Sequence, residues 1–354
     1  MNQNKASQNL DYFWKKKAIL SFIAVTLIVI IHNSATNQYS LPPGFFTQTT
    51  NTLHTFLAYI IGSIAVPLFF FLSGATLFRN YHRDLYFQKL KSRTKSILIP
   101  YLLWNIVGLL FAIIYTFTPL SSYISGRELF SPSLQNILEG IFLYKYNFQF
   151  WFLYDLIIYI ILTPIIYLLV KNKTVGTITC IFALFLPLFA PSPLGVNSYF
   201  TIFYIVGCFV GKHFLPLLTK PSTKLLQIIS LITTPILLTL KALSIYNIIF
   251  LPIVVSQILL LLLLFSVYYA ADTFIIKIKT TPSFTKESFP LYITHSYFIA
   301  IIVKLIYLIN PSSPVMLFLN EILSTIITIC IVIFLSKLLQ QKLPRVHAFL
   351  FGGR

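Results

Sequence analysis

The sequence is poor in charge, and poorest in negative charge. Only 10% of its 354 residues are charged, with 8 acids against 26 Lys and Arg. Soluble globular proteins carry about 25% charged residues. A chain with so little charge cannot cover a water-facing surface, which excludes a soluble multidomain enzyme and a disordered chain. Because 57% of the residues are hydrophobic, the composition is typical of a polytopic membrane protein.

Cysteine is also scarce. Cys180, Cys208 and Cys330 all lie inside apolar runs without CxxC spacing, so we interpret them as small hydrophobic residues in packed helices. The sequence contains no H-E-x-x-H, P-loop, G-x-S-x-G or Rossmann motif. Metal binding, nucleotide hydrolysis and a serine nucleophile elbow therefore have no support, and we expect no metal site.

The chain has ten apolar stretches close to the length of about 20 residues that a helix needs to cross a bilayer. We therefore predict an all-α bundle of about ten transmembrane helices. Residues 1–354 then form a single membrane domain without a separate soluble domain. The predicted spans are 17–35, 57–78, 97–118, 150–170, 174–190, 198–214, 224–241, 248–270, 288–308 and 315–336.

The net charge of +18 is distributed unequally between the two sides of these spans. The gaps on the side of the N-terminus hold 22 Lys and Arg, and the opposite gaps hold three: Arg127, Lys145 and Lys241. Basic residues prefer the cytoplasmic side, so we predict that both termini are cytoplasmic. Their place in short gaps also indicates contact with membrane lipids and argues against nucleic acid as a partner.

Two segments between the predicted spans have informative patterns. Residues 79–95 hold six Lys/Arg and one acid, which fits either a topology signal that attracts anionic lipid or a docking site for a polyanionic cytosolic ligand. In residues 134–142 the apolar positions follow i, i+3, i+4, i+7 and i+8. This spacing predicts a short amphipathic helix on the outer interface.

Five ionisable residues fall within the predicted spans, where they are costly and usually face the bundle interior: His32, Asp155, His295, Lys304 and Glu321. The helical rise places His32, Asp155 and Glu321 in one outer layer. His32 is either a hydrogen-bonded interfacial residue or a general base. Either acid could orient its ring or be a protonated structural group. Snorkelling accounts for Lys304.

Five segments carry motifs in a characteristic order: KKKAILSFIAVTLIVIIH ending at His32, VPLFFFLSG over 66–74, RTKSILIPYLLW over 93–104, WFLYDLIIYIILTP over 151–164, and SFPLYITHSYF over 288–298. Together they resemble the membrane-bound acyltransferase-3 family of bacteria over nearly the whole chain. The resemblance implies a multi-pass protein of the bacterial cytoplasmic membrane. Such proteins move an acyl group, usually acetyl, from cytosolic acyl-CoA to a hydroxyl of an extracytoplasmic or lipid-linked glycan. Acyl-CoA would be a co-substrate, with no permanently bound cofactor.

The resemblance also implies roles for residues in these motifs. His32 matches the family's proposed catalytic histidine, with Asp155 or Glu321 as candidates to tune it. The residues expected near coenzyme A are Arg79, Arg83, Arg93, Lys95 and Tyr101. Those expected on the substrate side are Ser73, Trp151 and His295. Three positions depart from the family pattern: Ser21 and Ser96 replace arginines, and Phe150 replaces a frequent histidine.

Two other function classes are compatible with the residues. Intramembrane charges and a basic vestibule also suit a transporter or exporter of a polysaccharide or lipid-linked sugar. Inverted repeats would favour that class, and the sequence has no obvious ones. A sensory or partner-binding membrane module is the third possibility.

Overall fold

The computed structural model describes residues 2–118 and 128–353, so Arg127 lies outside the described residues. Every regular element within these ranges is helical. The elements that position the site are α1 (Asn2–Ile31), α2 (Ala35–Gln38), α3 (Phe45–His54), α4 (Ala65–Phe78), α5 (Tyr86–Arg93), α6 (Ile99–Thr116), α7 (Leu134–Phe142), α8 (Trp151–Ile161), α9 (Thr163–Val170), α10 (Lys173–Phe189), α11 (Ser198–His213), α12 (Pro216–Thr219), α13 (Lys224–Ile245), α14 (Ile253–Ala270), α15 (Asp272–Ile275), α16 (Ser288–Tyr307), α17 (Pro314–Lys342) and α18 (Pro344–Phe351).

The predicted count of ten spans is not confirmed. Among the described residues, seven helical segments are long and apolar enough to cross a membrane, or eight if a bent pair counts as one span. The bent pair is α8 and α9, which meet at an angle of 70° beside Leu162. Pro164 lies at the start of α9 and lacks the amide hydrogen that would continue α8. The other short segments are α10, with 17 residues, and α11, with 16. The chain is nevertheless a multi-pass membrane protein.

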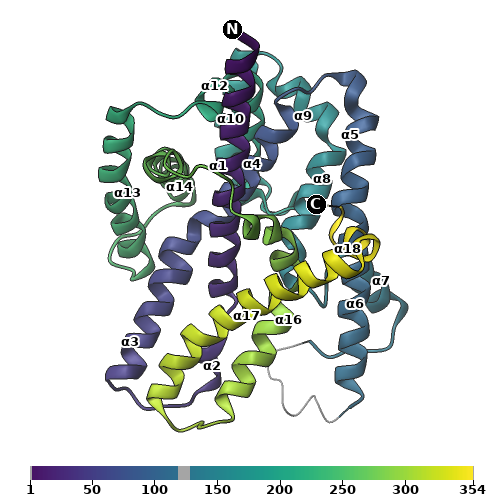
Figure 1. Cartoon of the computed structure of the whole chain (residues 1–354), viewed down its shortest axis with the longest axis vertical. Helices are drawn as coiled ribbons and strands as arrows, with labels where there is room; N and C mark the ends of the chain where they lie inside the picture. The colour runs from purple at the N-terminus through teal and green to yellow at the C-terminus, as the bar shows by residue number, and fades with distance from the viewer. Residues whose placement is uncertain (1, 119–127, 354) are drawn as a thin grey trace.

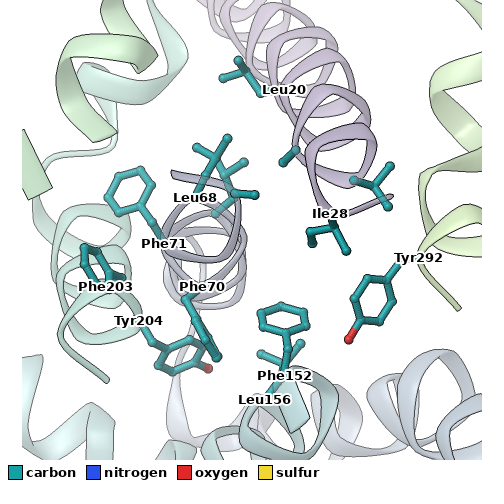
Figure 2. Packing of buried hydrophobic residues seen from close by; sticks show 14 of the residues in the cluster. Leu20, Ile28, Leu68, Phe70, Phe71, Phe152, Leu156, Phe203, Tyr204 and Tyr292 are labelled. Carbon is teal, nitrogen blue, oxygen red and sulfur yellow. The ribbon is translucent and has the colours of Figure 1, made fainter. Parts of the chain in front are cut away.

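Helix α1 runs through the middle of the bundle from the N-terminus at the top of Figure 1. The basic helix α5 lies in the same upper half, whereas α2 and the turn between α16 and α17 lie at the lower end. The core around α1 is aromatic and aliphatic. Figure 2 shows Leu20 and Ile28 of α1 facing the cluster that contains Phe70, Phe152 and Tyr292.

Helices α4 and α11 pack closely because glycines remove side chains from their contact. A Cβ atom on Gly207 would lie 2.2 Å from the carbonyl oxygen of Phe71, and one on Gly211 would lie 2.5 Å from that of Ala75. This agrees with a packing role for the Gly207-x-x-x-Gly211 motif.

A buried ion pair fastens the start of α1 to α14 and α15. The Lys16 ammonium lies 2.5 Å from an Asp272 carboxylate oxygen, and both side chains are fully buried. The Tyr12 hydroxyl donates to the same oxygen, and Ser222 donates its amide and hydroxyl hydrogens to the other. Lys16 also lies 3.5 Å from the centre of the Tyr268 ring.

The amphipathic segment 134–142 forms the predicted helix, α7. Ser133 caps its N-terminus by accepting a hydrogen bond from the Asn136 amide. Its last turn rests on α6, where the Tyr101 hydroxyl donates to the Phe142 carbonyl at 2.7 Å.

Candidate active site

In the described part of the chain, three cavities lie along α1 and the residues that directly follow it. The large cavity, about 530 Å³, is bounded by residues that include His32, Phe111, Tyr115, Ser296 and Lys304. The apolar cavity, about 250 Å³, is bounded by residues that include Lys17, Ser21, Ser73, Arg93, Phe152 and Tyr292. The amide cavity, about 360 Å³, is bounded by residues that include His32, Asn37, Asn51, His54 and Tyr59.

The large and apolar cavities occupy successive levels of the same helices. On α1, Lys17 and Ser21 line the apolar cavity, and His32, about three turns beyond Ser21 and just past the end of the helix, lines the large one. On α16, Tyr292 lines the apolar cavity and Ser296 lines the large one. Two helices therefore place the cavities in the same order, with His32 and His295 near the level where one gives way to the other.

His32 and His295 come together at this level. Their rings are nearly parallel, with an interplanar angle of 26° and a centroid distance of 5.2 Å. The Phe148 ring packs nearly perpendicular to the His32 ring, with a centroid distance of 5.0 Å. Within the described part of the chain, neither ring nitrogen of His32 has a hydrogen-bond partner, so both are available to a bound molecule.

The surroundings of His295 select one tautomer. Its Nδ1 lies 2.7 Å from the Tyr292 carbonyl oxygen and 3.2 Å from that of Leu291. Carbonyl oxygens only accept, so Nδ1 carries the hydrogen of the neutral ring and Nε2 presents a lone pair. The residue is fully buried, and Nε2 has no partner among the described residues. An unpaired buried acceptor is costly, which is typical of a functional site.

The two acids considered as partners of His32 have other partners. Asp155 is 1% exposed and accepts a hydrogen bond of 3.1 Å from the Asn197 amide, which ties α8 to the start of α11. Glu321 accepts a hydrogen bond from His54 Nδ1 at 2.8 Å. The structure thus brings His32 together with His295, and Glu321 together with His54.

The residues expected near coenzyme A have different surroundings. Arg93 lines the apolar cavity, whereas Lys95 is exposed and does not. Arg79 packs over the Trp14 ring at 5.1 Å, and Arg83 lies 6.0 Å from the Tyr167 ring. Tyr101 is engaged with the end of α7, as described above.

The residues expected on the substrate side also lie in different places. Ser73 lines the apolar cavity beside Arg93. Trp151 lines none of the three cavities and packs against Phe70 and Phe200, with centroid distances of 6.2 and 5.2 Å.

Two residues near the cavities were missed by sequence reasoning. Lys17 belongs to a basic run that indicates topology, yet it lines the apolar cavity one helical turn from Ser21. His54 precedes an apolar run and carries no motif, yet it is buried beside Glu321 and lines the amide cavity. The sequence signal that points to His54 is Glu321, because a carboxylate inside a span needs a partner.

The rim of the large cavity holds a small charge cluster. Lys145 donates to Glu139 at 2.7 Å and lies 3.5 Å from Glu128. The hydrogen bond from Lys145 lowers the pKa of the Glu139 carboxyl, and the same bond raises the pKa of Lys145. Glu139 and Lys145 therefore keep their opposite charges over the neutral pH range.

Comparison with known proteins identifies the family of the chain. A family model described as an acyltransferase domain matches residues 19–337. The chain belongs to this acyltransferase family. That confirms the resemblance drawn from the five motifs. The matched range contains His32, Arg93, His295 and Glu321.

One curated relative is the succinoglycan biosynthesis protein ExoH of Rhizobium meliloti (strain 1021), which is 26% identical over 204 residues. The match covers 55% of this chain and 53% of ExoH, so the chain spans about half the length of that relative. No solved structure matches the chain.

Proposed function

We propose that this protein is an integral membrane O-acyltransferase of the bacterial cytoplasmic membrane. It moves an acyl group, which we take to be acetyl, from cytosolic acyl-CoA to a hydroxyl of an extracytoplasmic or lipid-linked glycan. One observation carries the proposal: the His32–His295 pair lies where an apolar, arginine-lined cavity gives way to a larger polar one. A reaction between substrates from opposite sides of a membrane needs such an arrangement.

In this proposal the apolar cavity receives the donor. Its aromatic and aliphatic wall suits a pantetheine arm and a small uncharged acyl group, and Arg93 and Lys17 offer positive charge to the phosphates of coenzyme A. On the orientation predicted from the basic residues, this cavity faces the cytoplasm. The large cavity receives the acceptor sugar.

His32 performs the proton transfers. The acceptor hydroxyl oxygen attacks the thioester carbonyl carbon while His32 takes the hydroxyl proton. The new C–O bond forms, the C–S bond breaks, and the His32 imidazolium returns the proton to the thiolate of coenzyme A. A neutral imidazole suits both steps near neutral pH. His295 holds the His32 ring in place by stacking against it.

The test uses purified protein in nanodiscs with ¹⁴C-acetyl-CoA and surface polysaccharide from a strain that lacks the protein. We expect label to enter the polysaccharide with the wild type. His32→Gln keeps hydrogen bonding but removes the base, so the rate should fall about 10²–10⁴-fold. His82→Gln is the matched control, because His82 is exposed and lies outside all three cavities.

Two results would contradict the proposal. Absence of label in the polysaccharide with the wild type would remove the transfer reaction. Wild-type rates with His32→Gln would remove the catalytic role of His32.

A further inference from the structure

The proposed mechanism does not use the amide cavity, although this cavity adjoins the large cavity. It shares His32, Ser34 and Asn37 with the large cavity, so a molecule bound in one lies beside the other. It is formed by the end of α1, by α2 and by α3. These elements lie at the lower end of Figure 1, opposite the N-terminus.

The chemistry of its wall is polar and nearly uncharged. Asn37 and Asn51 are exposed, and each offers an amide donor and an amide acceptor. Tyr59 is 51% exposed and adds an aromatic face beside them. No Lys, Arg, Asp or Glu lines the cavity within the described residues. Such a wall suits a neutral molecule with many hydroxyl groups better than an ion.

His54 provides a fixed anchor in this wall. Its Nδ1 donates to Glu321 Oε1 at 2.8 Å, and both side chains are buried. The carboxylate holds the hydrogen on Nδ1, so the neutral ring has its lone pair on Nε2. Nε2 has no partner among the described residues, and the second oxygen of Glu321 is buried and unpartnered as well. The Tyr59 ring packs edge-on against His54 at 5.6 Å.

Glu321 is itself held firmly in place. Asn33, at the outer end of α1, donates from its side chain to the Glu321 carbonyl at 2.8 Å and to the Ser324 hydroxyl at 3.0 Å. The same residue accepts from the Ala35 amide at 2.9 Å, which fixes the turn into α2. The end of α1, the start of α2, the end of α3 and the first turns of α17 are therefore joined around the cavity, and its shape is built before any ligand arrives.

We propose that the amide cavity is a second acceptor subsite, which binds the neutral sugar unit adjacent to the one that is acylated. A hydroxyl of that sugar donates to His54 Nε2, and Asn51 and Asn37 bond to its other hydroxyls. The acceptor is then an oligosaccharide or polymer that spans both cavities across His32. This inference rests on the proposed transferase function.

The experiment compares two forms of one acceptor. Deacylated surface polysaccharide from a strain lacking the protein is cut into a single-sugar and an oligosaccharide fraction, and ¹⁴C-acetyl transfer to each is measured. We expect kcat/KM to be at least about tenfold higher for the oligosaccharides. Asn51→Ala removes one neutral hydrogen bond and should lower this ratio about fivefold. His54→Gln removes the anchor and should lower it at least as much.

Gln48→Ala is the matched control, because Gln48 is exposed on α3 and lies outside the cavity. It should keep the wild-type ratio. Equal wild-type values for the two fractions, or an unchanged ratio in both cavity variants, would overturn the subsite while leaving transfer intact. A fall in kcat shared equally by both fractions in His54→Gln would assign His54 to the chemistry instead. Absence of transfer to either fraction would overturn the proposed function and the subsite with it.

Discussion

Arg93 and Lys95 are two residues apart in the sequence, but their side chains lie in different surroundings. Two helical positions differ by about 200° around the axis. Arg93 therefore faces the apolar cavity, whereas Lys95 faces outward. Sequence matching ranks both as contacts of coenzyme A, because a one-dimensional motif does not record which side of the helix faces a cavity.

This difference gives a prediction at the scale of one residue. If the donor occupies the apolar cavity, Arg93→Ala loses a charge-assisted contact worth about 1.5–3 kcal/mol. The KM for acetyl-CoA should then rise about 10- to 100-fold. Lys95→Ala should change it less than about threefold, since an exposed charge is screened. Initial rates at varied acetyl-CoA give the comparison. Equal effects of the two substitutions would contradict a donor site in this cavity.

The pair formed by His32 and His295 shows what can and cannot be predicted from single residues. Both His32 and His295 stand in motifs, so each could be named as a candidate from the sequence. Their stacking could not be predicted, because it depends on how α1 and α16 are rotated against each other. The His54–Glu321 pair could not be predicted for the same reason, because its members come from α3 and α17.

At the scale of elements, the apolar runs predict where helices occur more accurately than they predict where those helices begin and end. The first run predicts a span at 17–35, whereas α1 begins at Asn2 and ends at Ile31. The last run predicts a span at 315–336, whereas α17 continues to Lys342. Hydropathy marks the part of a helix that crosses lipid, but backbone hydrogen bonds continue the helix into water until a cap or a proline stops it.

The basic run at the start of α1 shows a second limit of hydropathy. Consecutive helical residues point about 100° apart. Lys15 donates to the Ile278 carbonyl at 2.6 Å, Lys16 pairs with Asp272, and Lys17 lines the apolar cavity. Three residues that form one topology signal in the sequence therefore have three separate structural roles.

Lys16 and Asp272 yield a prediction about how α1 is held. Asp272→Asn leaves a buried ammonium without its counter-charge, which should destabilise the fold by about 3–5 kcal/mol. The Lys16→Met/Asp272→Leu double variant removes both charges and should lose less. Midpoints of thermal unfolding in detergent, followed by size-exclusion chromatography, give the order. Asp11→Asn, an exposed position on the same helix, is the control. If Asp272→Asn matched that control, the ion pair would not hold α1.

At the scale of the whole molecule, the all-helical multi-pass bundle predicted from the sequence is confirmed, whereas the predicted count of ten crossings is not confirmed. The uncertainty lies in α8–α11, where proline and short helices replace full spans. Two sets of contacts connect their ends. His213 at the end of α11 lies 2.7 Å from the Val170 carbonyl at the end of α9. Tyr154 of α8 donates to the Leu194 carbonyl, between α10 and α11, at 3.0 Å.

These contacts divide the segment into two sides. The ends of α9 and α11 meet near Tyr81, whose carbonyl accepts from Lys212 at 3.0 Å. The connection between α10 and α11 instead lies beside the first turn of α8, where Tyr154 contacts Leu194. This is the arrangement that three crossings, one each by α8–α9, α10 and α11, would require. Short and bent helices can therefore complete three crossings.

A topology prediction follows from this geometry and from the distribution of basic residues. Reporters fused after Leu41 and Ser192 should be extracytoplasmic, and those after Tyr86 and Pro221 should be cytoplasmic. Ser192 is the decisive site, because it lies in the connection between the two short helices. Paired alkaline phosphatase and green fluorescent protein fusions at each site measure both sides independently. A cytoplasmic signal after Ser192, with Leu41 still outside, would mean that α8–α10 do not cross as two spans, and the ten-span arrangement would fail at that point.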